Sequence, residues 1–130
     1  MDKVDSIKYW IDSSDRDFIT MEHLFEKEDY HWALFIGHLV IEKLLKAYFV
    51  KINDDYPPYA HNLLRLAIES KIKITDDLKL KLTTISAFNI NARYDDYKSS
   101  FQKRCTPQYT LEWIDKIKEL RSWILKQIKA

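Results

Sequence analysis

The most apolar stretch of this chain, the segment 30–51, contains four polar side chains at helical spacing. They are His31, His38, Glu42 and Lys46, separated by seven, four and four residues. In a helix this spacing places all four on one narrow face. Glu42 also precedes Lys46 in the order that favours an intrahelical ion pair. The face is either a polar strip that lines a cleft or meets a partner, or a solvated edge with one ion pair.

Arg93 is the second candidate for chemistry, because its planar guanidinium can bind a phosphate through two parallel hydrogen bonds. It lies in the segment 89–105, NINARYDDYKSSFQKRC, which has no strong apolar periodicity and which we expect to connect two helices. Connections in helical bundles usually have about 2–8 residues, and longer ones are often functional. The alternative is a structural ion pair of Arg93 with Asp95, Asp96 or a helix carboxylate.

His61 also has two interpretations. Its ring could cap backbone amides where a short helix begins, or it could bond to Glu42 or Arg93 as part of a binding site. Tyr94 and Tyr97 follow Arg93 closely, and each is either a ligand-binding residue or a packing residue with its hydroxyl at the surface.

The residues give little support for a metal site or for nucleophilic catalysis. His38 and Glu42 are one helical turn apart, but the chain has no HExxH or similar ligand set. The single cysteine, Cys105, excludes an internal disulfide and a cysteine-based zinc site. Arg104 could lower the pKa of this thiol, or the thiol is a bystander. We therefore predict no metal and no cofactor.

The composition is that of one globular domain, with 130 residues of which 46% are hydrophobic and 32% charged. One Gly and three Pro are too few for the turns of an all-β fold, and they exclude the glycine-rich loop of a P-loop or Rossmann site. The charges in the segment 30–51 argue against a membrane span, and residues 1–10 lack an apolar signal core. We expect one domain over residues 1–130, located in the cytoplasm.

The elements that must position the candidate residues are helices. The segment 30–51 is apolar on all sides, as expected of a helix packed against neighbours on most faces, and the only glycine, Gly37, indicates a close helix crossing. The preceding segment has inward positions at alternating intervals of three and four: Val4, Ile7, Ile11, Ser14 (a small polar gap), Phe18, Met21 and Phe25. The short link 26–29 implies that these two helices form an antiparallel hairpin.

Further helices follow the breaker that contains Pro57 and Pro58. One is short, the next begins at the N-cap Thr75, and the last begins at the N-cap Thr106 with Pro107 in the first helical position. Their inward residues are Leu63, Leu64, Ala67 and Ile68, then Leu78, Leu82, Ile85 and Phe88, then Leu111, Ile114, Ile117, Leu120, Ile124 and Ile128. The predicted fold class is all-α, an up-and-down bundle of four to five helices.

Charge is distributed unevenly along the chain. Residues 1–30 hold nine acids and four bases, net −5, whereas residues 98–130 hold eight bases and three acids, net +5. The basic end either forms a surface for a phosphate-bearing partner, or the first and last helices lie side by side and complement each other.

Three separated segments resemble one known family. IEKLLKAYFV, with Glu42 and Lys46, is similar to the EKxLKA signature of HEPN domains, the higher eukaryote and prokaryote nucleotide-binding helical bundles. AHNLLRL resembles the THxLxxL motif of that family and places His61 on its histidine. NARYDDY resembles the ARYP motif and places Arg93 and Tyr94 on it, with Asp95 where proline is common. The order and spacing of the three segments also agree with the family.

The resemblance implies a homodimeric bundle whose cleft gathers polar residues from the motif helices. Many members pair with a small nucleotidyltransferase in toxin–antitoxin systems, and many HEPN toxins are metal-independent ribonucleases that use an Arg followed four to six residues later by His. In this chain Arg93 is followed at those distances by Tyr97, Lys98 and Ser99. The general base is therefore missing from its expected place.

We therefore expect a HEPN-like homodimeric binding module for a nucleotide or RNA phosphate, partnered with a nucleotidyltransferase-type protein in a toxin–antitoxin or regulatory role. The predicted ligand-binding residues are Arg93, His61, Glu42, Lys46, Tyr94 and Tyr97. One alternative is a ribonuclease toxin centred on Arg93 with help from His61. The other is a non-catalytic interaction scaffold whose polar strip only specifies the dimer geometry.

Overall fold

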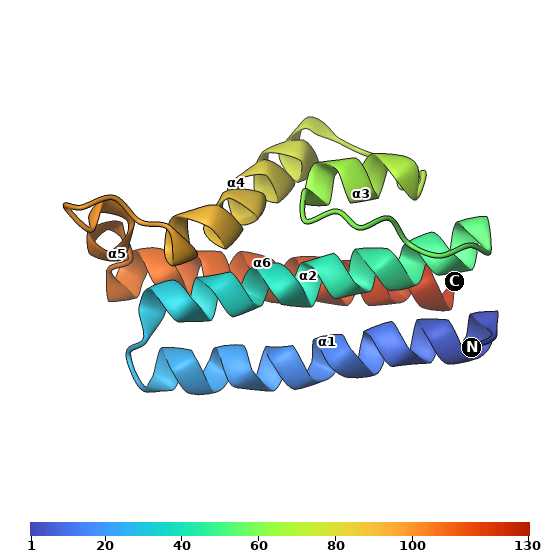
Figure 1. Ribbon diagram of the computed structural model, residues 1–130, viewed down its shortest axis with the longest axis horizontal. Coiled ribbons are helices and arrows are strands. Elements are labelled where there is room, and N and C mark those ends of the chain that lie inside the picture. Colours follow the sequence, from blue (N-terminus) through green and yellow to red (C-terminus); the bar gives the residue numbers. More distant parts are fainter.

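Helix α2 is the element against which the other helices pack. The computed structural model describes residues 1–130, and its helices are α1 (Lys3–Glu26), α2 (Tyr30–Asn53), α3 (Leu63–Glu69), α4 (Asp76–Arg93), α5 (Ser100–Arg104) and α6 (Pro107–Lys129). No strand is present, so the all-α fold class is confirmed. Helices α1, α2 and α6 run side by side, while α3 and α4 cover another side of α2 (Figure 1).

The predicted helix starts are confirmed by their caps. The hydroxyl of Thr75 accepts a hydrogen bond from the backbone N–H of Leu78 at 3.1 Å. The hydroxyl of Thr106 likewise accepts from the N–H of Tyr109 at 3.1 Å, and Pro107 begins α6. Each threonine satisfies an N–H group that has no partner within its helix. These starts follow from local chemistry, which is why the sequence alone predicted them.

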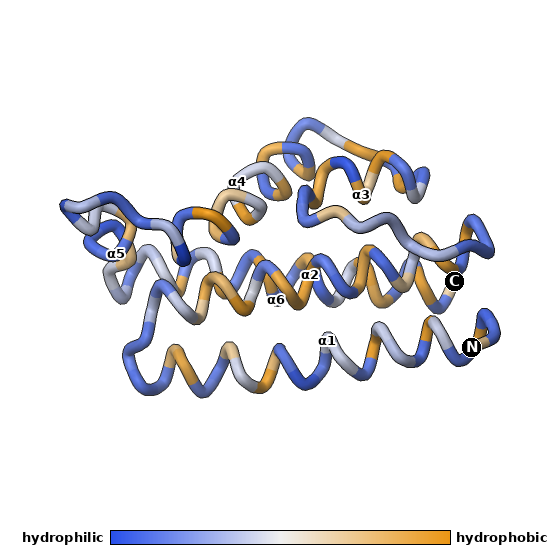
Figure 2. The backbone as a smooth tube through the Cα atoms, viewed as in Figure 1, coloured by the Kyte–Doolittle hydropathy of each residue, from blue (hydrophilic) through white to orange (hydrophobic).

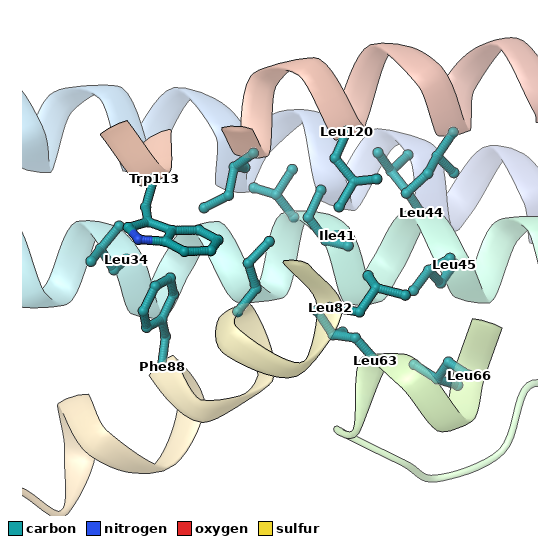
Figure 3. Packing of buried hydrophobic residues seen from close by; sticks show 14 of the residues in the cluster. Leu34, Ile41, Leu44, Leu45, Leu63, Leu66, Leu82, Phe88, Trp113 and Leu120 are labelled. Carbon is teal, nitrogen blue, oxygen red and sulfur yellow. The ribbon is translucent and has the colours of Figure 1, made fainter. Parts of the chain in front are cut away.

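The core forms where α2 faces its neighbours. Buried leucine, isoleucine and aromatic side chains from α2, α3, α4 and α6 interdigitate there (Figure 3), and apolar segments recur between polar ones along each long helix (Figure 2). A Cβ added to Gly37 would lie 2.6 Å from the Cδ1 atom of Ile117 and 3.1 Å from the sulfur of Met21. The close crossing predicted at Gly37 is therefore confirmed, and it involves both α1 and α6.

Polar contacts fix α1 against its neighbours. Ser14 is buried, as the predicted small polar gap, and its hydroxyl donates to the carbonyl of Val40 at 2.8 Å. Arg121 of α6 pairs with Asp15 of α1 at 3.1 Å. A second pair, between Lys118 and Glu22 at 3.5 Å, also joins these two helices. The interpretation that the acidic first helix and the basic last helix complement each other is thus confirmed.

The segment 89–105 is more helical than the sequence predicts. Helix α4 continues through Arg93, and the short helix α5 was not expected, so only residues 94–99 and Cys105 of this segment lie outside helices. The carboxylate of Asp95 accepts the N–H groups of Phe101 and Gln102 at 3.0 and 2.9 Å. Desolvation raises the pKa of Asp95, but the backbone hydrogen bonds outweigh this effect, so the pKa lies below its ordinary value. The five residues of α5 are too few to show apolar periodicity.

Three residues predicted to face inward are exposed. Val4, Ile68 and Leu111 have exposed fractions of 73%, 58% and 46%. Val4 lies in the first turn of α1, at the edge of the bundle. Ile68 follows the buried Leu63 by five residues, which turns it away from the buried side of α3. Thr110 is fully buried and takes the inward position beside Leu111. No helix combines the length and apolar character needed to cross a membrane.

Candidate functional site

Glu42 is the centre of a buried polar cluster on α2. Its side chain is only 5% exposed. One carboxylate oxygen accepts a hydrogen bond from the ammonium of Lys46 at 3.2 Å, and the other accepts from Nδ1 of His61 at 2.8 Å. A buried carboxylate is costly unless it is paired and hydrogen-bonded. The buried negative charge of Glu42 is therefore compensated by Lys46 and by the hydrogen bond from His61.

His61 is fixed to α2 through both its backbone and its ring. It precedes Asn62, whose side chain caps α3 by accepting the N–H of Arg65 at 3.0 Å. The carbonyl of His61 accepts a hydrogen bond from Nε2 of His38 at 2.9 Å. The His61 ring donates through Nδ1 to Glu42, while its side chain remains 62% exposed. Its Nε2 atom has no protein partner and is free to act on a ligand.

His38 lies fully buried between these groups. Burial lowers its pKa, an effect that the carbonyl of His61 and the charge of Glu42 partly oppose and the charge of Arg93 reinforces. The ring is therefore neutral near pH 7 and donates its single N–H through Nε2. Its Nδ1 atom is buried without a partner. His38 acts as the internal support that holds the His61 backbone against α2.

Arg93 ends α4 and carries a positive charge without a carboxylate partner. Its Nε donates to the carbonyl of Asn89 at 3.0 Å, and one Nη donates to the side-chain oxygen of Asn89 at 2.9 Å. The guanidinium lies 5.5 Å from the ring centroid of Phe35 and 5.1 Å from that of Tyr94. The alternative of an ion pair with Asp95 is wrong, because that carboxylate binds the backbone amides of α5 instead.

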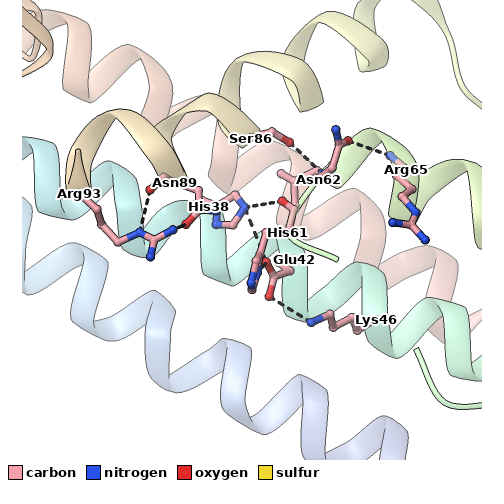
Figure 4. A network of polar contacts seen from close by, with 10 residues as sticks. His38, Glu42, Lys46, His61, Asn62, Arg65, Ser86, Asn89 and Arg93 are labelled. Atoms are coloured by element: carbon pink, nitrogen blue, oxygen red, sulfur yellow. Dashed lines mark hydrogen bonds and ion pairs between the residues drawn. The ribbon is translucent and has the colours of Figure 1, made fainter. Parts of the chain in front are cut away.

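The structure brings three of the six predicted site residues together in one cluster. His61, Glu42 and Lys46 are joined by direct contacts, and His38 separates them from Arg93 (Figure 4). Arg93 forms no direct bond with those three residues, although its charge acts on His38.

His31, the remaining member of the polar strip, is half-buried, and the two tyrosines of the predicted site differ in their surroundings. Tyr94 contacts the guanidinium of Arg93. Tyr97 is 93% exposed, and its ring contact is with Lys98 at 5.6 Å, outside the polar cluster. The alternative of a solvated edge is wrong for the polar strip, since His38, Glu42 and Lys46 are all buried.

Two supporting residues were not predicted. Asn89 holds Arg93 in place and could have been found from its position one helical turn earlier on α4. Ser86 accepts the N–H of Leu63 at 2.8 Å and so links α4 to the start of α3. No local signal identifies that contact, because it depends on the packing of two helices. No group of three or more His, Cys, Asp or Glu side chains is placed to hold a metal ion.

Comparisons with known proteins agree with this architecture. The family model of the HEPN domain matches residues 7–128. The fold is similar to the crystal structure of TT1696 from Thermus thermophilus, with a TM-score of 0.78 and 17% sequence identity over 92% of this chain and 96% of that chain. At this identity the likeness concerns the fold alone. Among curated proteins, none matches this chain significantly in sequence.

Proposed function

This chain belongs to the HEPN domain family, and from that premise we propose that it is a homodimeric module that binds the phosphate of a nucleotide or RNA. The observation that carries the proposal is the exposed Arg93 guanidinium, which has neutral partners only. Guanidinium groups bind phosphate through charge-assisted hydrogen bonds. Because Asn89 occupies Nε and one Nη, the other donors of Arg93 are available to a ligand.

His61 and Lys46 support the same function. The exposed ring of His61 presents Nε2, and the Lys46 ammonium donates to one acceptor only, the carboxylate of Glu42. An ammonium has three donors, so two of them remain for a ligand. Tyr94 supports Arg93 through its ring. These residues offer hydrogen-bond donors to a phosphate-bearing ligand from three separate segments of the chain.

A second copy and a partner protein complete the proposal. Exposed apolar side chains occur on the two helices that meet at Arg93, namely Trp32 on α2 and Ile90 on α4, and Tyr94 follows Arg93 directly. They support a homodimer that places two Arg93 sites near its interface. Light scattering should give twice the chain mass.

The partner is a nucleotidyltransferase-type protein in a toxin–antitoxin or regulatory pair. We therefore expect an adjacent gene that encodes such a protein, and we expect its product to co-purify with this chain.

Binding is tested with named probes and a matched arginine control. Titration calorimetry with ATP, GTP and a hexaribonucleotide should show binding of at least one probe. Arg93→Ala should weaken it about 10–100-fold, as expected for the loss of hydrogen bonds to a charged group. Arg65→Ala removes an exposed arginine that pairs with Glu69 and should have no effect. Failure of every probe to bind, or equal binding by Arg93→Ala, would contradict the proposal.

The Glu42–His61 pair favours a second candidate function, a metal-independent endoribonuclease. A carboxylate that holds Nδ1–H leaves the lone pair of Nε2 as a general base. In that reaction Nε2 takes the proton of the RNA 2′-hydroxyl, and the 2′-oxygen bonds to phosphorus. The bond from phosphorus to the 5′-oxygen breaks, and this oxygen takes a proton from solvent. Arg93 would stabilise the charge that develops on the phosphate.

Cleavage separates the two candidates. A ribonuclease should convert RNA to fragments with 2′,3′-cyclic phosphate ends in the presence of a chelator, and His61→Ala and Arg93→Ala should each remove the activity. Binding without cleavage assigns the binding module. An intact dimer that neither binds nor cleaves would leave the non-catalytic scaffold, in which the polar cluster serves only the geometry of assembly.

A further inference from the structure

A pocket of about 340 Å³ includes Lys46 in its lining, and Lys46 lies at the end of the polar cluster opposite Arg93 (Figure 4). The pocket lies between α1, α2 and the segment that follows α2. It is lined by Trp10, Lys46, Tyr56, Pro57, Pro58 and Tyr59. Five of these six side chains are aromatic or proline rings, so the pocket offers flat apolar walls.

Lys46 is the one charged residue of this pocket. Its ammonium lies 5.2 Å from the ring centroid of Trp10 and 3.2 Å from the carboxylate of Glu42. The side chain is only 9% exposed, yet Glu42 is its only hydrogen-bond acceptor in the protein. Two N–H donors of a buried ammonium therefore lack a partner. A ligand acceptor that enters the pocket can take these donors in charge-assisted hydrogen bonds.

Flat walls and one cationic donor suit a nucleobase. A base presents a π-face that stacks on aromatic side chains, whatever its sequence identity, and it carries carbonyl and ring nitrogen acceptors at its edge for Lys46. A phosphate group alone would leave the ring walls unused. Tyr56 and Tyr59 are 85% and 103% exposed, so their rings are free to stack against a base that enters between them and Trp10.

The separation of this pocket from Arg93 determines the length of the ligand. The Arg93 guanidinium lies over Phe35, and Lys46 follows Phe35 by eleven residues on α2. Over eleven residues a helix completes about three full turns and rises by about 16 Å. Phe35 and Lys46 therefore lie on one side of α2. A stacked strand advances by about 3.4 Å per nucleotide. A mononucleotide is too short to occupy both positions, whereas a strand of several nucleotides spans them.

We infer that the ligand of this site is a single-stranded RNA segment several nucleotides long that lies along α2, an inference that rests on the proposed phosphate site at Arg93. One phosphate binds Arg93, and a base several nucleotides away stacks in the pocket against Trp10 with its acceptors on Lys46. His61 lies between the two positions (Figure 4) and presents its exposed ring to the connecting backbone. The pocket therefore selects oligonucleotides over mononucleotides.

The test compares ligand lengths on the full chain. Fluorescence anisotropy with a labelled hexaribonucleotide, competed by unlabelled hexamer or by the mononucleotide, should show at least tenfold tighter binding of the hexamer. Trp10→Ala should weaken hexamer binding about tenfold and leave mononucleotide binding unchanged. Tyr59→Ala should act in the same direction. Because Tyr59 is fully exposed, this variant keeps the test valid if Trp10→Ala unfolds. Leu80→Ala, an exposed apolar side chain on α4, is the control.

The outcomes separate this inference from the proposed function. Equal affinity of the native protein for hexamer and mononucleotide would overturn the pocket as a base site and leave the phosphate site at Arg93 intact. Undiminished hexamer binding by both Trp10→Ala and Tyr59→Ala would do the same. If no probe binds the native protein, the proposed function fails, and this inference fails with it.

Discussion

The exposed imidazole of His61 donates a hydrogen bond of 2.8 Å to the buried carboxylate of Glu42, nineteen residues earlier in the chain. The pair joins the segment before α3 to the middle of α2. It also connects the solvent-exposed ring of His61 to the buried charge of Glu42. Lys46 donates to the same carboxylate. A ligand that binds either His61 or Lys46 therefore affects a hydrogen bond to Glu42.

Removal of both charges of the Glu42–Lys46 pair should cost little stability. Glu42→Ala alone leaves a buried ammonium unpaired and should lower the free energy of unfolding by about 3–5 kcal/mol. The double variant Glu42→Gln with Lys46→Met keeps an acceptor for His61 and removes both charges, so most of this loss should be recovered. Urea denaturation measures both values. A double variant as unstable as Glu42→Ala would contradict this account of the pair.

The free energy of unfolding should fall as the pH is lowered, because His38 titrates. Burial lowers its pKa below the ordinary value of 6.5 in the folded protein, so the unfolded chain takes up the proton first. The stabilisation is complete above about pH 6.5 and is lost as the pH falls toward the folded pKa. His38→Gln keeps a donor and does not titrate, so its free energy of unfolding should depend less steeply on pH between 7 and 5. A slope unchanged from the native protein would exclude this origin.

Gly37 should resist even the smallest enlargement. The added Cβ of Gly37→Ala meets the end of the Ile117 side chain at 2.6 Å, and overpacking typically costs about 1–3 kcal/mol. Alanine regains about 1 kcal/mol of helix propensity, so the expected net loss is about 1 kcal/mol. Thermal or urea unfolding measures it. If the variant were more stable than the native protein, the crossing of α1, α2 and α6 at Gly37 would not be close.

Cys105 should be inert in the folded protein. Burial raises the pKa of its thiol to about 11, an effect that the nearby Arg104 only partly opposes. At pH 8 this leaves about a hundredfold less thiolate than an ordinary cysteine has, and the thiolate is the reactive form. A disulfide reagent should therefore modify the native chain at least a hundredfold more slowly than the chain in urea. Similar rates in both conditions would contradict the buried position.

The helices themselves follow from the sequence. Thr75 and Thr106 cap the helices that the sequence predicts, and Gly37 marks the crossing that its position indicates. Each of these features depends on neighbours within one or two helical turns or on the apolar pattern of a single helix. Such information is present in any local window of the chain. The all-α class and the central position of α2 could therefore be predicted before any coordinates.

The tertiary structure alone decided which polar side chains meet and which stay apart. The pattern on α2 placed Glu42 and Lys46 on one face, but only the fold brings His61 onto that carboxylate and buries His38 beneath it. Only the fold keeps Asp95 away from Arg93, because the Asp95 carboxylate accepts the backbone N–H groups of Phe101 and Gln102 in α5. The physical reason is that these contacts join residues from different elements. Their geometry depends on the packing of whole helices around α2, which no local preference of the chain encodes.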